Sequence, residues 1–356
     1  MTIEINALPE DQRGHCPEKY TFGTGFADHM FSQSHDTERN WHSAQIHPLK
    51  ALSLHPAAAV LHYSQEIFEG LKAYRRKDGG INLFRPQENA ARFNRSATRM
   101  VMPEVDTTLH VEAMKQLVGL DSAWVPADNG SSLYIRPTMI ATTPKLGLGA
   151  AASYLHYIIT GPAGPYYPQG FNPVSVYVSH QYRRAVKGGV GEAKTGGNYA
   201  ASLYCSEAAA KKGYTQVLWL DAIEGRYVEE VGAMNICFVY DGKLIKTPQL
   251  NGSILAGITR DSLLKLAPTL GYEVEEAKVD IHQILADINS GKITEVFGCG
   301  TAAVVSPVGL IAMQDKEYRI NQGETGPVAK HLFDELMAIQ YGNAPDPFGW
   351  VVPVEN

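Results

Sequence analysis

The segment from Glu192 to Tyr199 places a lysine beside two glycines and a tyrosine, in the order Glu-Ala-Lys-Thr-Gly-Gly-Asn-Tyr. The amine of Lys194 can form a Schiff base with a carbonyl compound. Gly196 and Gly197 lack a Cβ, so the backbone can approach a flat ligand closely or take positive φ. The phenol of Tyr199 could bond an oxygen on the ligand's ring. These residue types suit pyridoxal phosphate, and the alternative for so short a motif is a surface lysine in a glycine-rich loop.

A carboxylate pair and a helix start offer two further groups that such a cofactor needs. Its pyridine nitrogen needs a carboxylate, and residues 228 to 235 supply Glu229 and Glu230. In a strand these two would point to opposite faces, so one serves the ring and the other is solvated. The step at residues 257 to 259 opens an apolar-periodic helix, whose first N–H groups and positive dipole end would face a phosphate. The alternative is that Thr259 only caps this helix.

Seven segments, in order and in register, resemble the branched-chain amino acid aminotransferases, which are pyridoxal phosphate enzymes of fold type IV. The resemblance extends from about Trp41 to Trp350. The seven segments are residues 54 to 74, 84 to 100, 132 to 142, 191 to 204, 227 to 242, 251 to 264 and 295 to 307. The resemblance implies reversible transfer of an amino group from Leu, Ile or Val to 2-oxoglutarate. It also implies a homodimer that acts on small molecules.

The resemblance assigns the chemistry to individual residues. Lys194 matches the family's Schiff-base lysine, whose freed amine then shuttles a proton as the catalytic group. Tyr199 matches the tyrosine that bonds the cofactor's 3′-oxygen. The family pattern Glu-Val-Gly-x-Met-Asn selects Glu230 for the pyridine nitrogen. The phosphate is expected at Ile258 and Thr259.

The remaining phosphate and carboxylate contacts also follow from the resemblance. Arg92 matches the phosphate arginine, although the residues themselves do not separate it from Arg95 and Arg99, which lie on the same expected helix. Thr301 and Ala302 match a turn that offers a hydroxyl and N–H groups to the substrate carboxylate and to the phosphate. The alternative for these two is an ordinary turn after a strand.

Substrate choice is expected to come from an aromatic wall and one polar anchor. Arg136 matches the arginine that contacts the side-chain carboxylate of glutamate, and its alternative role is that of a structural ion-pair residue. Leu148 is expected to close the pocket of a second subunit. The residues that match the pocket wall are Tyr63, Phe68, Tyr134 and Tyr166.

Composition excludes several other classes of function. A formal charge of -6 argues against nucleic acid or an anionic membrane as a partner. No apolar run approaches the roughly 20 residues that span a bilayer. The N-terminal residues include acids and no apolar core of a signal peptide, so we expect a cytoplasmic protein. Four cysteines lie far apart and predict no metal site, and the sequence assigns no role to Cys299.

The elements that must position these residues form an α/β (α+β) fold with two domains. Apolar and β-branched patterns predict strands at 132–142, 154–160, 174–179, 216–221, 235–240 and 295–297, and helices at 89–101, 111–125, 199–212, 259–270 and 328–341. Residues 161–173 hold four prolines and three glycines. We interpret them as an interdomain loop or lid between domains 1–160 and 174–356. The resemblance implies a small N-terminal domain and a larger pseudo-barrel domain that binds the cofactor.

Overall fold

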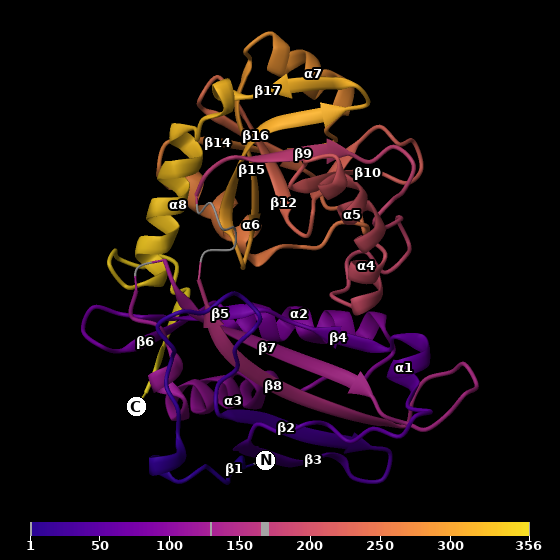
Figure 1. Cartoon of the computed structure of the whole chain (residues 1–356), viewed down its shortest axis with the longest axis vertical. Coiled ribbons are helices and arrows are strands. Elements are labelled where there is room, and N and C mark those ends of the chain that lie inside the picture. The colour runs from indigo at the N-terminus through magenta and orange to yellow at the C-terminus, as the bar shows by residue number, and fades with distance from the viewer. Residues whose placement is uncertain (1, 129, 165–170, 356) are drawn as a thin grey trace. The chain divides into compact units, whose positions relative to one another are not determined.

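The computed structural model describes residues 2–128, 130–164 and 171–355. The chain forms two compact units (Figure 1). The first unit comprises Met1–Tyr166, Ala193–Gly196 and Ala338–Asn356, and the second comprises Tyr167–Glu192 and Gly197–Met337.

A mixed sheet of nine described strands forms the frame of the first unit. Adjacent strands in this sheet are antiparallel, except that β1 is parallel to β3. Strand β4 (Glu66–Phe68) pairs with β7 beside the main path. The other strands, in spatial order, are β1 (Glu4–Ile5), β3 (Asn40–Pro48), β2 (His29–Asp36), β8 (Ser153–Ala163), β7 (Ser132–Ala141), β5 (Leu71–Arg75), β6 (Ile81–Phe84) and β18 (Val351–Val354).

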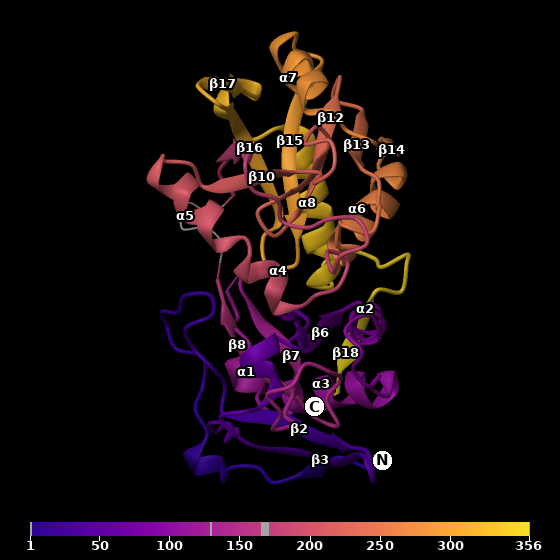
Figure 2. The same cartoon turned by 90° about the vertical axis from the view of Figure 1, so that its right-hand side faces the viewer.

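Two helices of this unit, α2 (Pro86–Arg99) and α3 (Thr107–Leu120), contact each other and lie on the same side of strands β7 and β8 (Figure 2). Pro86 occupies the first turn of α2, where a missing N–H costs nothing. Asp106 caps α3 by accepting the N–H groups of Thr108 and Leu109. Both helices place apolar side chains in a core with the strands. The predicted helices at 89–101 and 111–125 are therefore confirmed, with earlier starts and ends. The short helices are α1 (Ala59–Tyr63), η1 (Glu10–Gln12) and η2 (Ser122–Trp124).

Strand β8 runs further than the sequence predicts. Gly161, Pro162 and Ala163 continue it in register with β7, so the expectation that the loop starts at residue 161 is wrong. The pairing of β8 with β2 ends at Ile159, which leaves Pro162 paired on one side alone. A proline fits there because it has no N–H to donate, and the unpaired side of the strand needs no donor. Residues 165–170 of the expected loop lie outside the described residues.

The second unit contains another sheet of nine described strands, with helices against it. Strand β9 is parallel to β10 and β16, and β13 is parallel to β14, while the other pairs are antiparallel. In spatial order the strands are β11 (Val228–Val231), β10 (Gln216–Leu220), β9 (Val174–Val178), β16 (Val304–Met313), β15 (Ile293–Gly300), β12 (Asn235–Tyr240), β13 (Leu244–Pro248) and β14 (Glu273–Ala277), with β17 (Lys316–Arg319) beside β16. The strands predicted within this unit are confirmed.

The predicted helix at 199–212 is divided in two, α4 (Gly196–Ala200) and α5 (Leu203–Lys211). The hydroxyl of Ser202 donates to the carbonyl of Tyr199 at 2.7 Å, a local bond that competes with helix continuation. Helices predicted at 259–270 and 328–341 are confirmed as α6 (Ile258–Thr269) and α8 (Pro327–Gln340). The remaining elements are α7 (Ile281–Asn289) and η3 (Asn321–Gly323).

The two units differ from the predicted domains 1–160 and 174–356 in which residues they contain. Residues 338–356 belong to the first unit because β18 pairs with β6, and residues 193–196 belong to it as well. In the described part of the chain, no helix is both long and apolar enough to span a bilayer.

Candidate active site

The backbone around Lys194 is fixed by three hydrogen bonds within the first unit. Its carbonyl accepts the N–H of Phe68 at 3.0 Å, and its own N–H donates to the hydroxyl of Ser96 at 2.9 Å. Next to it, the hydroxyl of Thr195 donates to the carbonyl of Glu66 at 2.7 Å. The starting point of the lysine side chain is therefore set by β4 and α2, two ordered elements.

Three of the predicted substrate residues form a chain of contacts that starts at this lysine. The amine of Lys194 lies 4.8 Å from the centroid of the Phe68 ring. The guanidinium carbon of Arg136 lies 4.8 Å from the same centroid and 5.1 Å from that of Tyr134. Arg136 also donates to the Tyr134 hydroxyl at 3.0 Å. Two cations over one aromatic ring are held by its negative face, and together they make this group suited to an anionic substrate.

Arg136 retains hydrogen-bonding capacity. Its Nε is buried and has no hydrogen-bond partner among the described residues. A buried donor of this kind is normally satisfied, so a ligand oxygen is a natural partner for it. Among the described residues Arg136 makes no ion pair, but its charge opposes the rise that burial causes in the pKa of Glu66, so the alternative of a structural role remains.

Arg92 forms a buried, two-pronged ion pair with Glu69. The Nε–Oε1 distance is 2.6 Å and the Nη2–Oε2 distance is 2.8 Å. Burial raises the pKa of Glu69, but Arg92, Lys194 and the Asn89 amide together outweigh burial and hold that pKa below its usual value. Arg95 and Arg99 are exposed, so burial separates Arg92 from its two neighbours, which the sequence alone could not do. The sequence analysis missed Glu69, although it lies in a segment that carries the resemblance.

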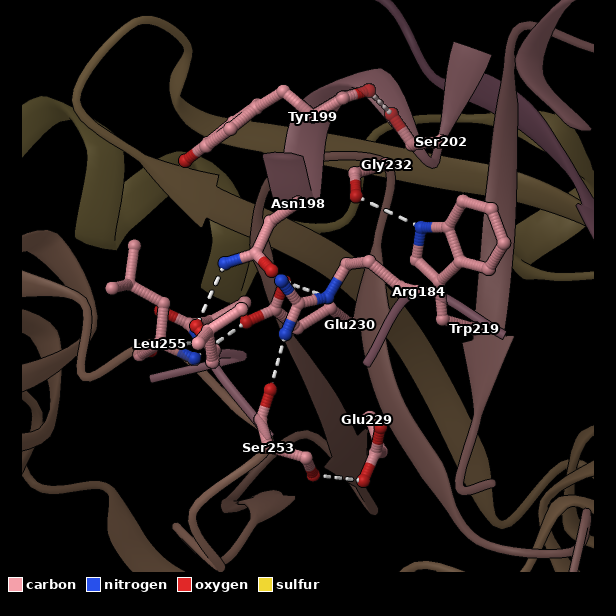
Figure 3. A network of polar contacts seen from close by, with 12 residues as sticks. Arg184, Asn198, Tyr199, Ser202, Trp219, Glu229, Glu230, Gly232, Ser253 and Leu255 are labelled. Atoms are coloured by element: carbon pink, nitrogen blue, oxygen red, sulfur yellow. Dashed lines mark hydrogen bonds and ion pairs between the residues drawn. The ribbon is translucent and has the colours of Figure 1, made fainter. Parts of the chain in front are cut away.

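In the second unit, Glu230 lies on β11 and is held by two partners (Figure 3). Its Oε1 accepts the N–H of Leu255 at 2.8 Å, and its Oε2 lies 3.0 Å from Nε of Arg184. Arg184 also donates from Nη2 to the carbonyl of Ser253. Neither Arg184 nor the 253–255 backbone has a sequence pattern that marks it, because each acts through a contact distant in the chain.

Glu229 corrects one expectation. The strand at residues 228–231 is confirmed, but the prediction that Glu229 is solvated is wrong, since its exposed fraction is 3%. Its Oε1 accepts the hydroxyl of Ser253 and the side-chain N–H of Asn251, the latter at 3.1 Å. The Asn251 and Ser253 donors take the place of the water that would hydrate an exposed carboxylate.

The expected phosphate end lies at the start of α6. Gly257 is its N-cap, without a side-chain cap, so Thr259 does not cap this helix. A Cβ at Gly257 would collide with Oδ1 of Asn235, so a larger residue there would have to displace this buried side chain. Ile258 and Thr259 follow in the first turn and are buried. The first N–H groups of a helix have no intrahelical acceptor, which makes this turn suited to an anion.

The other predicted residues lie in turns and helices of the two units. Thr301 and Ala302 lie in the turn between β15 and β16. Tyr199 lies in α4, and its backbone carbonyl accepts the Ser202 hydroxyl (Figure 3). Tyr63 lies in α1, and its hydroxyl donates to the carbonyl of Leu146. Tyr166 lies outside the described residues.

Comparison with known proteins shows the family to which the chain belongs. Residues 66–311 match the family model described as Amino-transferase class IV. The probable branched-chain-amino-acid aminotransferase of Streptomyces coelicolor is 50% identical over 355 residues, covering 98% of each chain.

Solved structures show the same fold. The Escherichia coli branched-chain amino acid aminotransferase matches with a TM-score of 0.76 and 27% identity, over 92% of this chain and 99% of that one. The branched-chain amino acid aminotransferase from Thermobaculum terrenum, in its PLP-form, matches with a TM-score of 0.75 and 26% identity, over 92% of this chain and 98% of that one. The expected α/β (α+β) fold is confirmed, and the chain belongs to the class IV aminotransferases and, within them, to the branched-chain-amino-acid aminotransferases.

Proposed function

We propose that this protein is a pyridoxal phosphate-dependent transaminase that moves an amino group reversibly between Leu, Ile or Val and 2-oxoglutarate. The observation that carries the proposal is the group formed by Lys194, Phe68 and Arg136, in which an amine and a guanidinium lie 4.8 Å from one aromatic ring. An amine that can bind a carbonyl compound and a cation that can bind a carboxylate are the two functions that amino exchange with glutamate requires.

The residues present fit the cofactor. Lys194 would hold it through the ε-amine, and Tyr199 would bond its ring oxygen. The phosphate would be held by Arg92, by the first turn of α6 at Ile258 and Thr259, and by Thr301. The buried Glu230 carboxylate, with Arg184 beside it, suits a protonated ring nitrogen. When bound, the cofactor withdraws electrons from the substrate's α-carbon, which makes the amino exchange possible.

The protein's own groups then have distinct tasks. The amine of Lys194 would take the proton from the substrate's α-carbon and deliver it to the cofactor, acting first as general base and then as general acid. Phe68 covers the approach to this amine with an apolar ring. Arg184 and the N–H of Leu255 keep the Glu230 carboxylate oriented, so that it holds a proton on the ring nitrogen.

One pocket would accept both kinds of substrate because its lining combines aromatic residues with one arginine. Tyr63, Phe68, Tyr134 and Tyr166 would surround an aliphatic side chain. Arg136 would bind the side-chain carboxylate of glutamate, and when leucine is bound its guanidinium would keep the hydrogen bond to the Tyr134 hydroxyl and the contact with the Phe68 ring. Thr301 and Ala302 would receive the α-carboxylate.

We also propose that the enzyme is a cytoplasmic homodimer. Leu146 and Leu148 are 68% and 83% exposed in neighbouring positions, and large apolar side chains in such a loop suit a contact with a second copy. Light scattering after gel filtration should give twice the monomer mass for the wild type. Leu148→Asp should shift the mass toward the monomer, and a monomeric wild type would contradict the assembly.

The activity is tested by spectroscopy. Protein purified with pyridoxal phosphate should absorb visible light, the band should move when L-leucine is added, and 2-oxoglutarate should restore it. A protein that stays colourless with added cofactor would contradict the proposal. A band that moves with D-leucine and not with L-leucine would contradict the substrate class while leaving the cofactor in place.

A further inference from the structure

A second pocket lies in the second unit and encloses about 220 Å³. Its lining includes Glu229, Ile254, Ala277, Val279, Lys187 and Lys278. Of the described residues proposed to hold the cofactor, none belongs to this lining. The pocket is smaller than the roughly 300 to 1,000 Å³ typical for drug-sized ligands, so its occupant would be a single small metabolite.

Glu229 gives the pocket a buried acceptor. Its side chain is 3% exposed, and Oε1 already accepts from Ser253 and Asn251. Its Oε2 is buried and has no hydrogen-bond partner within the described residues. A buried carboxylate oxygen without a donor is costly, and a ligand ammonium group is the partner that would satisfy it best.

Two cationic side chains lie at the mouth of the pocket. Lys187 and Lys278 are exposed there, together with one exposed acid, Glu224. Asp221 also lines the pocket, but its two oxygens accept four backbone N–H groups, so it is committed to the turn that follows it. The charges of the two lysines are balanced by those of Glu224 and Asp221, so the exposed ammonium groups of Lys187 and Lys278, rather than a net charge, are what can contact a carboxylate.

Between these two ends the wall is apolar. Ile254 and Val279 are buried, and Ala277 is half-buried. A molecule that matches this order has an ammonium group, an aliphatic side chain and a carboxylate. We propose that the pocket binds a free aliphatic α-amino acid, with its ammonium group on Glu229, its side chain against Ile254 and Val279, and its carboxylate at Lys187 and Lys278.

A short chain of contacts connects this pocket with Glu230 (Figure 3). The Ser253 hydroxyl contacts Glu229, and the Ser253 carbonyl accepts from Arg184, which pairs with Glu230 at 3.0 Å. An occupant that draws Glu229 toward itself would therefore act on the residue that orients Glu230. This coupling rests on the proposed role of Glu230, whereas the binding site itself does not.

Binding is tested on the borohydride-reduced holoenzyme, in which the lysine that holds the cofactor is no longer free to react. The probe is α-methyl-leucine, which has no α-hydrogen, and the measurement is isothermal titration calorimetry. We expect one saturable site in the wild type. Glu229→Gln should weaken it about tenfold or more, because a charge-assisted hydrogen bond is lost.

Two further variants keep the test decisive. Ala222 lines the pocket from an exposed position, so Ala222→Trp should block binding without a buried substitution. Phe68→Ala, in the first unit, removes part of the aromatic wall proposed to surround an aliphatic substrate, and it should leave the affinity unchanged. The proposal is overturned by the absence of a saturable site, by equal affinity in Glu229→Gln or Ala222→Trp, or by loss of binding in Phe68→Ala, which would place the probe in the active site.

The coupling has its own readout. Fluorescence of the reduced cofactor should change as the probe saturates the pocket, and Ser253→Ala should bind the probe without that change. Unchanged fluorescence in a saturated wild type would contradict the coupling but not the site. Failure of the proposed transaminase function is seen separately, as the absence of a leucine-dependent band in the unreduced enzyme.

Discussion

Arg184 and Glu230 form an ion pair with an Nε–Oε2 distance of 3.0 Å, and the exposed fractions of their side chains are 8% and 5%. Charges this deeply buried are tolerated only when each is paired with an opposite charge. Removal of one partner typically lowers the free energy of unfolding by about 3 to 5 kcal/mol. Arg184 also donates to the Ser253 carbonyl, so two separate groups hold its guanidinium. We infer that the carboxylate proposed for the ring nitrogen depends on this arginine.

Arg184→Met should therefore lower both the free energy of unfolding and turnover per folded molecule, since the Glu230 carboxylate loses its cation. Denaturant unfolding and initial rates with leucine measure the two effects. Arg183→Met is the matched control, because Arg183 binds backbone carbonyls such as those of Asp221 and His180, and it should lower stability alone. Unchanged turnover in Arg184→Met would contradict the inferred dependence.

The two adjacent carboxylates of β11 can be separated by substitution. Glu230→Gln should keep the cofactor bound and slow proton transfer at the α-carbon by about 100-fold, a typical loss for one group that stabilises developing charge. Single-turnover kinetics with deuterated and ordinary leucine isolate that step. A larger loss in Glu229→Gln than in Glu230→Gln would assign the ring nitrogen to Glu229 instead.

Arg136→Met should harm the two half-reactions unequally. The contact with the glutamate side chain is charge-assisted and worth about 1.5 to 3 kcal/mol, whereas leucine makes no such contact. Single-turnover rates with each amino acid, as a function of its concentration, give the ratio. Equal losses with glutamate and leucine would reject the proposed anchor.

The sequence analysis predicted most elements because their signals are local. Alternating apolar residues predicted β7 and β12, and apolar residues three and four apart predicted α3 and α6. Local signals failed where distant residues decide. Pro162 can remain in β8 because the pairing with β2 extends only to Ile159. Glu229 is buried because Asn251 and Ser253 donate hydrogen bonds to it.

The residues of the candidate site likewise include some that motifs predict and others that they do not. The motifs led to Lys194 and Glu230, but not to the partners that hold them. Ser96 lies 98 positions from Lys194, and Glu69 lies 23 positions from Arg92. Hydrogen bonds over such separations leave no periodicity in the sequence, so Ser96, Glu69 and Arg184 required the structure.

The buried His110 and His156 predict a pH dependence of stability. Their rings stack at 4.9 Å, and burial lowers the pKa of His110 from 6.5 to about 4. The unfolded chain therefore binds a proton between these two pH values that the folded chain does not bind. Stability should fall as the pH drops from about 6.5 toward 4, by up to about 1.4 kcal/mol per pH unit for each such histidine.

Denaturant unfolding across this pH range measures the slope. His110→Phe keeps a ring against Phe93 and removes one titrating group, so its slope should be smaller than that of the wild type. A slope that is the same in His110→Phe would show that other groups cause the acid sensitivity.

The most direct test of the account is the position of the cofactor on the chain. Borohydride reduction of the holoenzyme, followed by proteolysis and mass spectrometry of the peptides, identifies the lysine that carries the pyridoxyl group. We predict a single label on Lys194, the residue held by Phe68 and Ser96. Lys194→Ala should carry no label, though cofactor should still bind reversibly through its phosphate contacts. A label on Lys72, which is buried in β5, or on Lys187, which lines the second pocket, would contradict the assignment of the active site.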